Sequence, residues 1–117
     1  GQMATLSSHL LNGVDGTHAA QVDMTLTRIA ADGGRELVLS AKSDEGGRLS
    51  VNVDTPANAT YEMAIASGSY FHGQKLPRSG LQIVEDIVIR FSMPDPEARY
   101  HIPVIMSPNS YSCWWSE

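Results

Sequence analysis

Histidine, arginine and cysteine side chains are the main candidates in this sequence for catalysis or metal binding. Histidines occur at positions 9, 18, 72 and 101, and an imidazole exchanges protons near neutral pH. His9 lies in the apolar segment 6–11 and His101 in the segment 100–105. Each could be a structural residue, or the two could form a metal-binding pair or an acid–base pair. Because the sequence has no His-x-His spacing and one cysteine, we predict no metal site.

Arg48 and Cys113 are the other candidates. Arg48 follows the turn 44–47. It is either a solvated turn residue or a fixed guanidinium that grips a carboxylate, an imide oxygen or a urea-like ligand. No neighbour in the sequence would lower the pKa of the Cys113 thiol, so we interpret this residue as a small packed side chain. A single cysteine cannot form an intramolecular disulfide, which favours a reducing compartment and predicts a cytoplasmic protein.

Hydrophobic alternation with a period of two predicts that strands position these groups. Apolar and polar residues alternate over 22–27, 37–40, 49–53 and 61–66, and two further strands are expected at 83–91 and 101–106. Gly73, Pro77 and Gly80 leave room for at most a short turn of helix between 70 and 81. Short strands separated by turn residues such as Asn12-Gly13 predict an all-β sandwich or barrel.

Length and charge exclude several classes of protein. A chain of 117 residues is typical of one domain, which we place at 1–117. Thirteen acidic residues against eight basic ones, with no basic cluster, argue against nucleic acid as a partner. No apolar run approaches the ~18 residues that span a bilayer, so we predict no membrane partner. No signal peptide is visible, and Met3 is expected to be the natural first residue, with Gly1 and Gln2 a cloning remnant.

Three blocks of sequence follow the order and spacing of one family's motifs. The block Leu6-Ser7-Ser8-His9-Leu10-Leu11-Asn12 matches L-S-x-H-x-L-D/N, and Asp44-Glu45-Gly46-Gly47-Arg48 is similar to the turn T-x-x-D-G-R. The stretch from Tyr100-His101-Ile102-Pro103 to Tyr111-Ser112 matches Y-H-x-P-L-L-x-S-P-x-x-Y-S. The chain thus resembles the transthyretin-like proteins over essentially its whole length, specifically the 5-hydroxyisourate hydrolases of purine catabolism.

The resemblance implies a transthyretin-like two-sheet sandwich of about eight strands with one short helix. It also implies a homotetramer, built as a dimer of dimers, whose active sites lie in a channel between dimers. Carried over by motif position, the catalytic residues are His9, Arg48 and His101. The two histidines would share water activation and proton donation, and Arg48 would bind an oxygen of the substrate ring. No cofactor is implied, because opening a cyclic amide needs only water and proton transfers.

The C-terminus departs from the family pattern. Trp114-Trp115-Ser116-Glu117 stand where the hydrolases end in Y-R-G-S, so that Trp115 takes the place of the arginine. We expect Ser112, Trp114, Trp115 and Ser116 to contact the substrate, although tryptophans could also simply cover an interface. His18 stands where the family usually has proline.

Three functions remain open at this stage. The first is hydrolysis of 5-hydroxyisourate. The second is a hydrolase or cyclase in specialised metabolism, because paired indoles would make the pocket more apolar and would stack on another cyclic or aromatic substrate. The third is a non-catalytic tetramer that binds a small ligand. The presence of His9, Arg48 and His101 argues against the third, because ligand transport alone needs none of them.

Overall fold

The computed structural model describes residues 3–74 and 80–117, and this part of the chain forms nine strands and one short helix. In chain order the elements are β1 (Met3–Asn12), β2 (Asp23–Ile29), β3 (Arg35–Lys42), β4 (Arg48–Asp54), β5 (Ala59–Ile65), α1 (Ser67–His72), β6 (Ile87–Met93), β7 (Arg99–His101), β8 (Val104–Ser107) and β9 (Ser110–Cys113). The helix has six residues, and no helix in the described ranges is long and apolar enough to cross a membrane.

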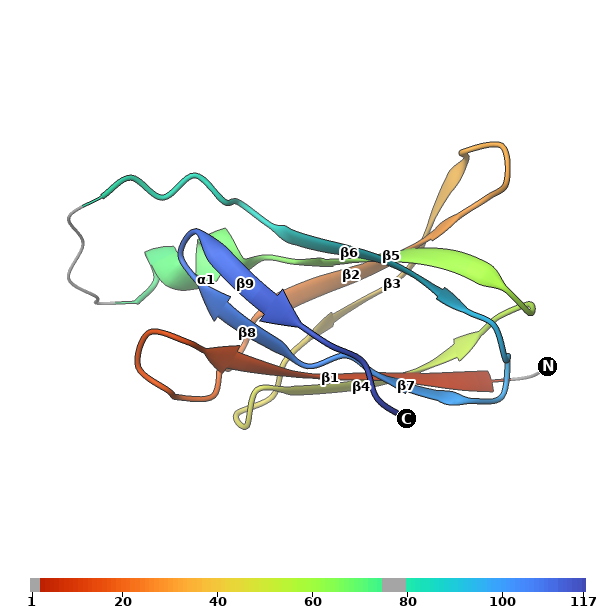
Figure 1. Cartoon of the computed structure of the whole chain (residues 1–117), viewed down its shortest axis with the longest axis horizontal. Coiled ribbons are helices and arrows are strands. Elements are labelled where there is room, and N and C mark those ends of the chain that lie inside the picture. The colour runs from red at the N-terminus through yellow and green to blue at the C-terminus, as the bar shows by residue number, and fades with distance from the viewer. Residues whose placement is uncertain (1–2, 75–79) are drawn as a thin grey trace.

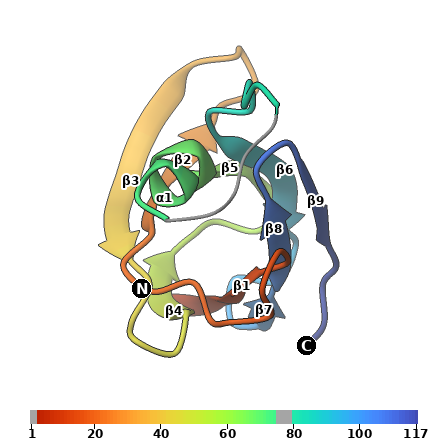
Figure 2. The same cartoon turned by 90° about the vertical axis from the view of Figure 1, so that its left-hand side faces the viewer.

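The strands form two sheets that pack face to face (Figure 1). One sheet has the order β3-β2-β5-β6; the other has the order β4-β1-β8-β9, with β7 paired to β1 next to β8. Figure 2 looks along the sandwich from the end that carries α1, with the core between the two layers. The prediction of an all-β two-sheet sandwich with one short helix is confirmed.

The buried face of each strand follows from its alternating sequence. In β5, Tyr61, Met63 and Ile65 are fully buried, and in β2 Met24 and Leu26 are buried as well. Side chains from both sheets contribute to one apolar cluster. Because a large apolar side chain contributes about 1.5–3 kcal/mol when it is fully buried, this face sets the register of each strand.

Strand β3 departs from the simple alternation. The sequence pattern groups Leu37 with Leu39 on one face, yet Leu37 is 62% exposed while Leu39 packs against the core. The register of β2 against β3 shifts here, since Leu26 pairs with Leu39 and the next residue, Thr27, pairs with Leu37. The extra residue at this β-bulge is Val38, and it turns Leu37 away from the core.

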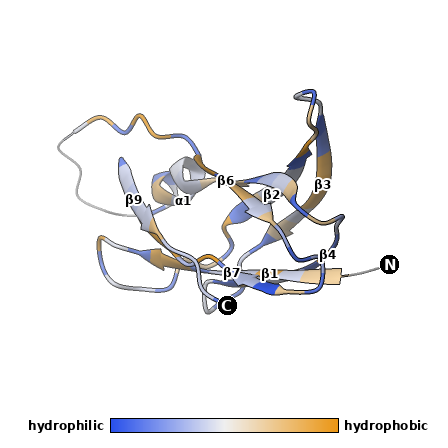
Figure 3. Ribbon diagram, turned by 45° about the vertical axis from the view of Figure 1, so that its right-hand side comes forward, coloured by the Kyte–Doolittle hydropathy of each residue, from blue (hydrophilic) through white to orange (hydrophobic). Residues whose placement is uncertain are grey.

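Two other predicted segments differ at their ends. The strand expected at 83–91 begins at Ile87, because the side-chain oxygen of Asn109 accepts the N–H of Ile83 at 2.7 Å and its amide donates to the Leu81 carbonyl at 2.8 Å. Figure 3 shows alternating hydrophobic and hydrophilic residues in this stretch before β6, where Leu81 and Ile83 are exposed. The helix begins at Ser67, earlier than expected; residues 75–79 of that prediction lie outside the described residues.

The segment expected as one strand at 101–106 forms parts of two strands. Strands β7 and β8 follow one another along the same edge of β1, both parallel to it. Ile102 and Pro103 separate them. Proline has no N–H to donate to the ladder, so pairing stops at Pro103 and resumes at Val104.

Candidate active site

The outward face of β1 carries the residues around which the site is built. Ala4, Leu6, Ser8 and Leu10 are buried, so the residues between them point to the opposite surface. His9 is therefore half-exposed between Ser7 and Leu11. We call this outward surface of the β4-β1-β8-β9 sheet, including β7, the histidine face.

Arg48 lies directly beside His9. The two are opposed across the antiparallel pair β1–β4, and directly opposed residues place their side chains on the same face of a sheet. A tight turn sets the start of β4: one carboxylate oxygen of Asp44 accepts the N–H groups of Gly46 and Arg48, each at 2.9 Å. Arg48 is thus held at the first position of its strand by its own turn.

Gly47 makes this turn possible. Its φ of +74° lies in the left-handed region, and a Cβ atom here would collide with the carbonyl oxygen of Leu10. Gly47 also accepts the N–H of Leu10 at 2.7 Å, which ties the turn to β1 next to His9.

Replacing Gly47 by alanine is expected to lower the free energy of unfolding by about 2–3 kcal/mol, since the turn has no space for a methyl group. Urea unfolding measures this change. Gly46→Ala is the matched control, because its Cβ would meet the Asp44 carboxylate at an ordinary 3.5 Å. Equal destabilisation by the two substitutions would contradict the role given to Gly47.

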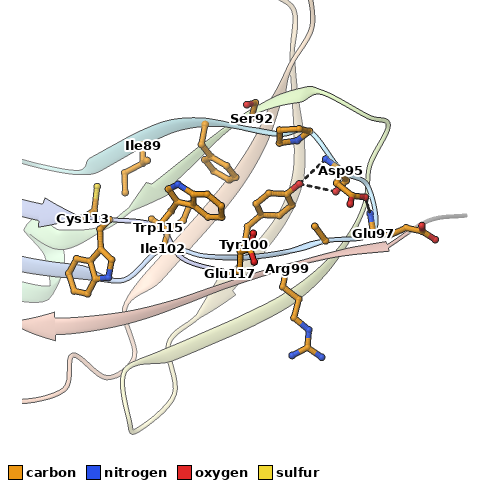
Figure 4. A pocket seen from close by; sticks show the side chains of 14 residues that line it. Ile89, Ser92, Asp95, Glu97, Arg99, Tyr100, Ile102, Cys113, Trp115 and Glu117 are labelled. Atoms are coloured by element: carbon orange, nitrogen blue, oxygen red, sulfur yellow. Dashed lines mark hydrogen bonds between the residues drawn. The ribbon is translucent and has the colours of Figure 1, made fainter.

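His101 reaches the same face from β7. It pairs in register with Ser7, and the Ser7 hydroxyl is hydrogen-bonded to His101 Nδ1 at 2.8 Å. The preceding Tyr100 points the other way: its hydroxyl accepts the Asp95 N–H at 2.8 Å and donates to the Asp95 carbonyl at 2.9 Å (Figure 4). Tyr100 thus anchors β7 on the side opposite the histidine face, and Ser7 orients the His101 imidazole on that face.

The C-terminal segment brings Ser116 next to His101. The N–H of His101 donates to the Ser116 carbonyl at 2.9 Å, and the N–H of Ser116 donates back at 2.8 Å. This antiparallel bridge places the Ser116 side chain on the histidine face. Ser112 pairs with Ile105, which in turn neighbours Leu11. Ser112 therefore lies on the same face, level with Leu11, two residues along β1 from His9.

Trp115 is placed differently from the other candidate residues. Its ring packs against the Tyr100 ring with centroids 6.3 Å apart, and the side chain remains largely exposed. There it lines a groove of 980 Å³ together with Ile89, Phe91, Ile102 and Cys113 (Figure 4). Trp114 also borders this groove. The structure thus brings His9, Arg48, His101 and Ser116 together and separates Trp115 from them.

The groove offers few groups that could carry out acid–base chemistry. Its centre is aromatic and aliphatic, and none of the residues that line it is a histidine. Cys113, which we expected to be packed, is exposed at its edge. We therefore place the chemistry on the histidine face, where bases and a cation converge.

Electrostatics distinguish His9 from an ordinary surface histidine. Partial burial lowers its pKa below the usual 6.5, and the charges of Arg48, His18 and His101 lower it further. The backbone of Gly46 has the opposite effect and raises the pKa of His9. His9 is thus neutral at pH 7 and able to accept a proton.

This lowered pKa predicts the acid limb of the pH profile. If neutral His9 is required, kcat/KM stays level as the pH falls past 6.5 and declines only at a lower pH. The rate measured from about pH 8 to about pH 5, corrected for spontaneous substrate decay, checks this. An acid limb with an apparent pKa above 6.5 would argue against His9 as the essential base.

Sequence reasoning did not assign roles to two residues of the site. Ser7 lies two positions before His9, and period-two alternation alone would have placed it on the same face. His18 contacts the His9 ring directly, with His9 Nε2 and His18 Nδ1 2.9 Å apart.

His, Cys, Asp and Glu do not gather in groups of three that could hold a metal within the described ranges.

The two-sheet sandwich with one short helix has the transthyretin fold. Transthyretin from Sparus aurata superposes with a TM-score of 0.81 at 21% identity, covering 95% of each chain. The crystal structure of (S)-allantoin synthase gives a TM-score of 0.84 at 25% identity. That match covers 99% of this chain, which spans 44% of the other protein's chain.

Sequence comparison identifies the family. The HIUase/Transthyretin family model matches residues 6–115, so the chain belongs to that family. A 5-hydroxyisourate hydrolase of Halalkalibacterium halodurans is 30% identical over 93% of this chain and 94% of its own. 5-Hydroxyisourate hydrolase 2 of Rhizobium meliloti is 31% identical, and the match covers 93% of this chain and 92% of that protein. The protein is a hydrolase of the transthyretin family.

Proposed function

We propose that the protein hydrolyses 5-hydroxyisourate, using His9, Arg48 and His101. The observation that carries the proposal is their placement on one face of adjacent strands, with His9 held neutral by its surroundings. The names of the curated relatives supply the substrate.

Each residue has a role in the reaction. His9 is the base that gains a proton when the oxygen of water attacks the ring carbonyl, and Arg48 stabilises the oxyanion that forms. When the tetrahedral intermediate collapses, the carbon–nitrogen bond breaks and His101 donates a proton to the leaving nitrogen. Ser7 holds His101 in position for this step. The reaction adds one water across the amide bond and needs no cofactor.

The C-terminal residues complete the substrate site in this proposal. Ser112 and Ser116 offer hydroxyls on the histidine face, whereas Trp114 and Trp115 border the apolar groove and offer it their flat rings. Because Trp115 stands at the arginine position and packs on Tyr100, no guanidinium is supplied from there. This observation favours a second candidate, a hydrolase or cyclase of this fold that acts on another cyclic or aromatic compound.

We also propose a cytoplasmic homotetramer, a dimer of dimers. Strand β6 is at one edge of its sheet and β9 is at one edge of the other, and the apolar groove runs between them. A second copy would cover both the edges and the groove. Sedimentation of the purified protein tests this, and a monomer at micromolar concentration would contradict it.

A coupled assay tests the function. Urate oxidase generates 5-hydroxyisourate, and its ultraviolet absorbance is followed with and without the protein. Acceleration above the spontaneous rate, lost in His101→Ala, supports the proposal. No acceleration by folded protein would overturn it in favour of another cyclic substrate.

A further inference from the structure

His18 lies beside the proposed base. Residues 17–19 continue the edge of the sheet beyond the start of β4: Ala19 N–H donates to the Leu10 carbonyl at 2.9 Å, and Asn12 N–H donates to the Thr17 carbonyl at 2.8 Å. His18 is therefore opposed to Leu11 in an antiparallel bridge, which places its side chain on the histidine face. His18 thus lies along the same edge of β1 as Arg48, whereas His101 lies across the opposite edge.

The two imidazoles are joined edge to edge. His9 Nε2 and His18 Nδ1 are 2.9 Å apart, the ring centroids are 4.9 Å apart and the planes differ by 22°. Two neutral imidazoles at this distance share one N–H···N hydrogen bond. His18 is exposed, and within the described part of the chain its Nε2 has no hydrogen-bond partner.

The relay requires one particular placement of the ring hydrogens. The backbone carbonyl of Gly46, which raises the pKa of His9, can only accept a hydrogen bond, so we assign the single hydrogen of neutral His9 to its Nδ1. A neutral imidazole has a single N–H, so His9 Nε2 must then accept the hydrogen on His18 Nδ1. In this arrangement the nitrogen with a free lone pair is His18 Nε2, which is at the exposed end of the two linked rings.

We propose that His18 is the outer member of a two-imidazole proton relay whose inner member is His9. The inference rests on the proposed hydrolysis for its substrate. As water attacks the ring carbonyl, its oxygen–hydrogen bond breaks and the proton passes to His18 Nε2, while the proton on His18 Nδ1 passes to His9 Nε2. His9 becomes the imidazolium and His18 stays neutral. The extra proton then returns from His9 Nε2 to His18 Nδ1 while His18 Nε2 releases a proton to solvent, which restores both rings, and His101 regains a proton from solvent.

The charges around His9 suit a relay that returns its proton. Arg48 from β4 and His101 from β7 both face His9, and together with partial burial they disfavour its charged form. A proton that reaches His9 is thus given back readily. Proline, which the family usually has at this position, could not take part.

Three variants at His18 test the relay. His18→Asn retains an amide N–H that can still orient His9 but cannot pass a proton on, and His18→Ala leaves open space for added imidazole. We expect kcat to fall about 10–100-fold in both, with KM within about twofold, and imidazole to restore kcat in His18→Ala only. His18→Pro, the family residue, should behave like His18→Asn. His72→Ala, at an exposed histidine in α1, should change nothing.

Full activity of His18→Asn, or absence of imidazole rescue in His18→Ala, would overturn the relay. An NMR titration of the histidine side chains needs no substrate and separates this inference from the proposed function. Linked protonation of the two rings, with the titration of His9 altered in His18→Asn, is expected. Independent titration of His9 and His18 would overturn the inference whether or not 5-hydroxyisourate is hydrolysed.

Discussion

Replacement of His101 by alanine is expected to lower kcat by about 10²–10⁴-fold while the protein remains folded. The imidazole is half-exposed on the histidine face, so its removal opens no core cavity. Strand β7 stays in place through its pairing with β1 and through the buried Tyr100. His9→Ala is expected to lower kcat by a similar factor, because each histidine carries out one of the two proton transfers.

Ser7→Ala separates positioning from chemistry in this experiment. It removes the partner of His101 Nδ1 but keeps the imidazole, so we expect a smaller fall in kcat, about tenfold. Thermal unfolding and steady-state kinetics on the same preparations distinguish lost catalysis from lost fold. Folded His9→Ala and His101→Ala proteins with wild-type kcat would exclude the roles given to these residues.

The sequence predicted the strands whose apolar residues alternate and face one core. Tyr61, Met63 and Ile65 show why: with a period of two, a shift of one residue would expose all three. At Leu37 the same reasoning failed, because an inserted residue inverts the alternation without changing the composition of the strand. Bulges depend on the partner strand, which one segment of sequence does not describe.

The site was predicted by motif rather than by periodicity. His9, Arg48 and His101 are far apart in the chain, and only the pairings of β1 with β4 and of β1 with β7 make them neighbours. Two contacts needed the three-dimensional structure. Successive side chains of the C-terminal segment point to opposite sides, so Trp115 turns toward Tyr100 while Ser116 points to the histidine face. His18 meets His9 because the chain after β1 folds back along β1.

Substitution of Arg48 is expected to give the second large effect on kcat. Two substitutions separate the contribution of its charge from that of its planar guanidinium. Arg48→Gln is expected to lower kcat by about 10²–10³-fold, the usual loss when one oxyanion donor is removed. Arg48→Lys keeps the charge but loses the planar fork that reaches two acceptors, so we expect it to recover only part of that loss. Arg35→Lys is the control: this exposed arginine pairs with Glu62 at 2.6 Å and should leave kcat unchanged.

The pH profile of the same variants tests a second consequence. The charge of Arg48 helps to lower the pKa of His9, so the acid limb of kcat/KM should move toward pH 6.5 in Arg48→Gln and stay in place in Arg48→Lys. A rise in KM alone, with kcat and the acid limb unchanged, would mean that Arg48 binds the substrate without stabilising the oxyanion. A shifted limb with normal kcat would assign Arg48 to the tuning of His9 alone.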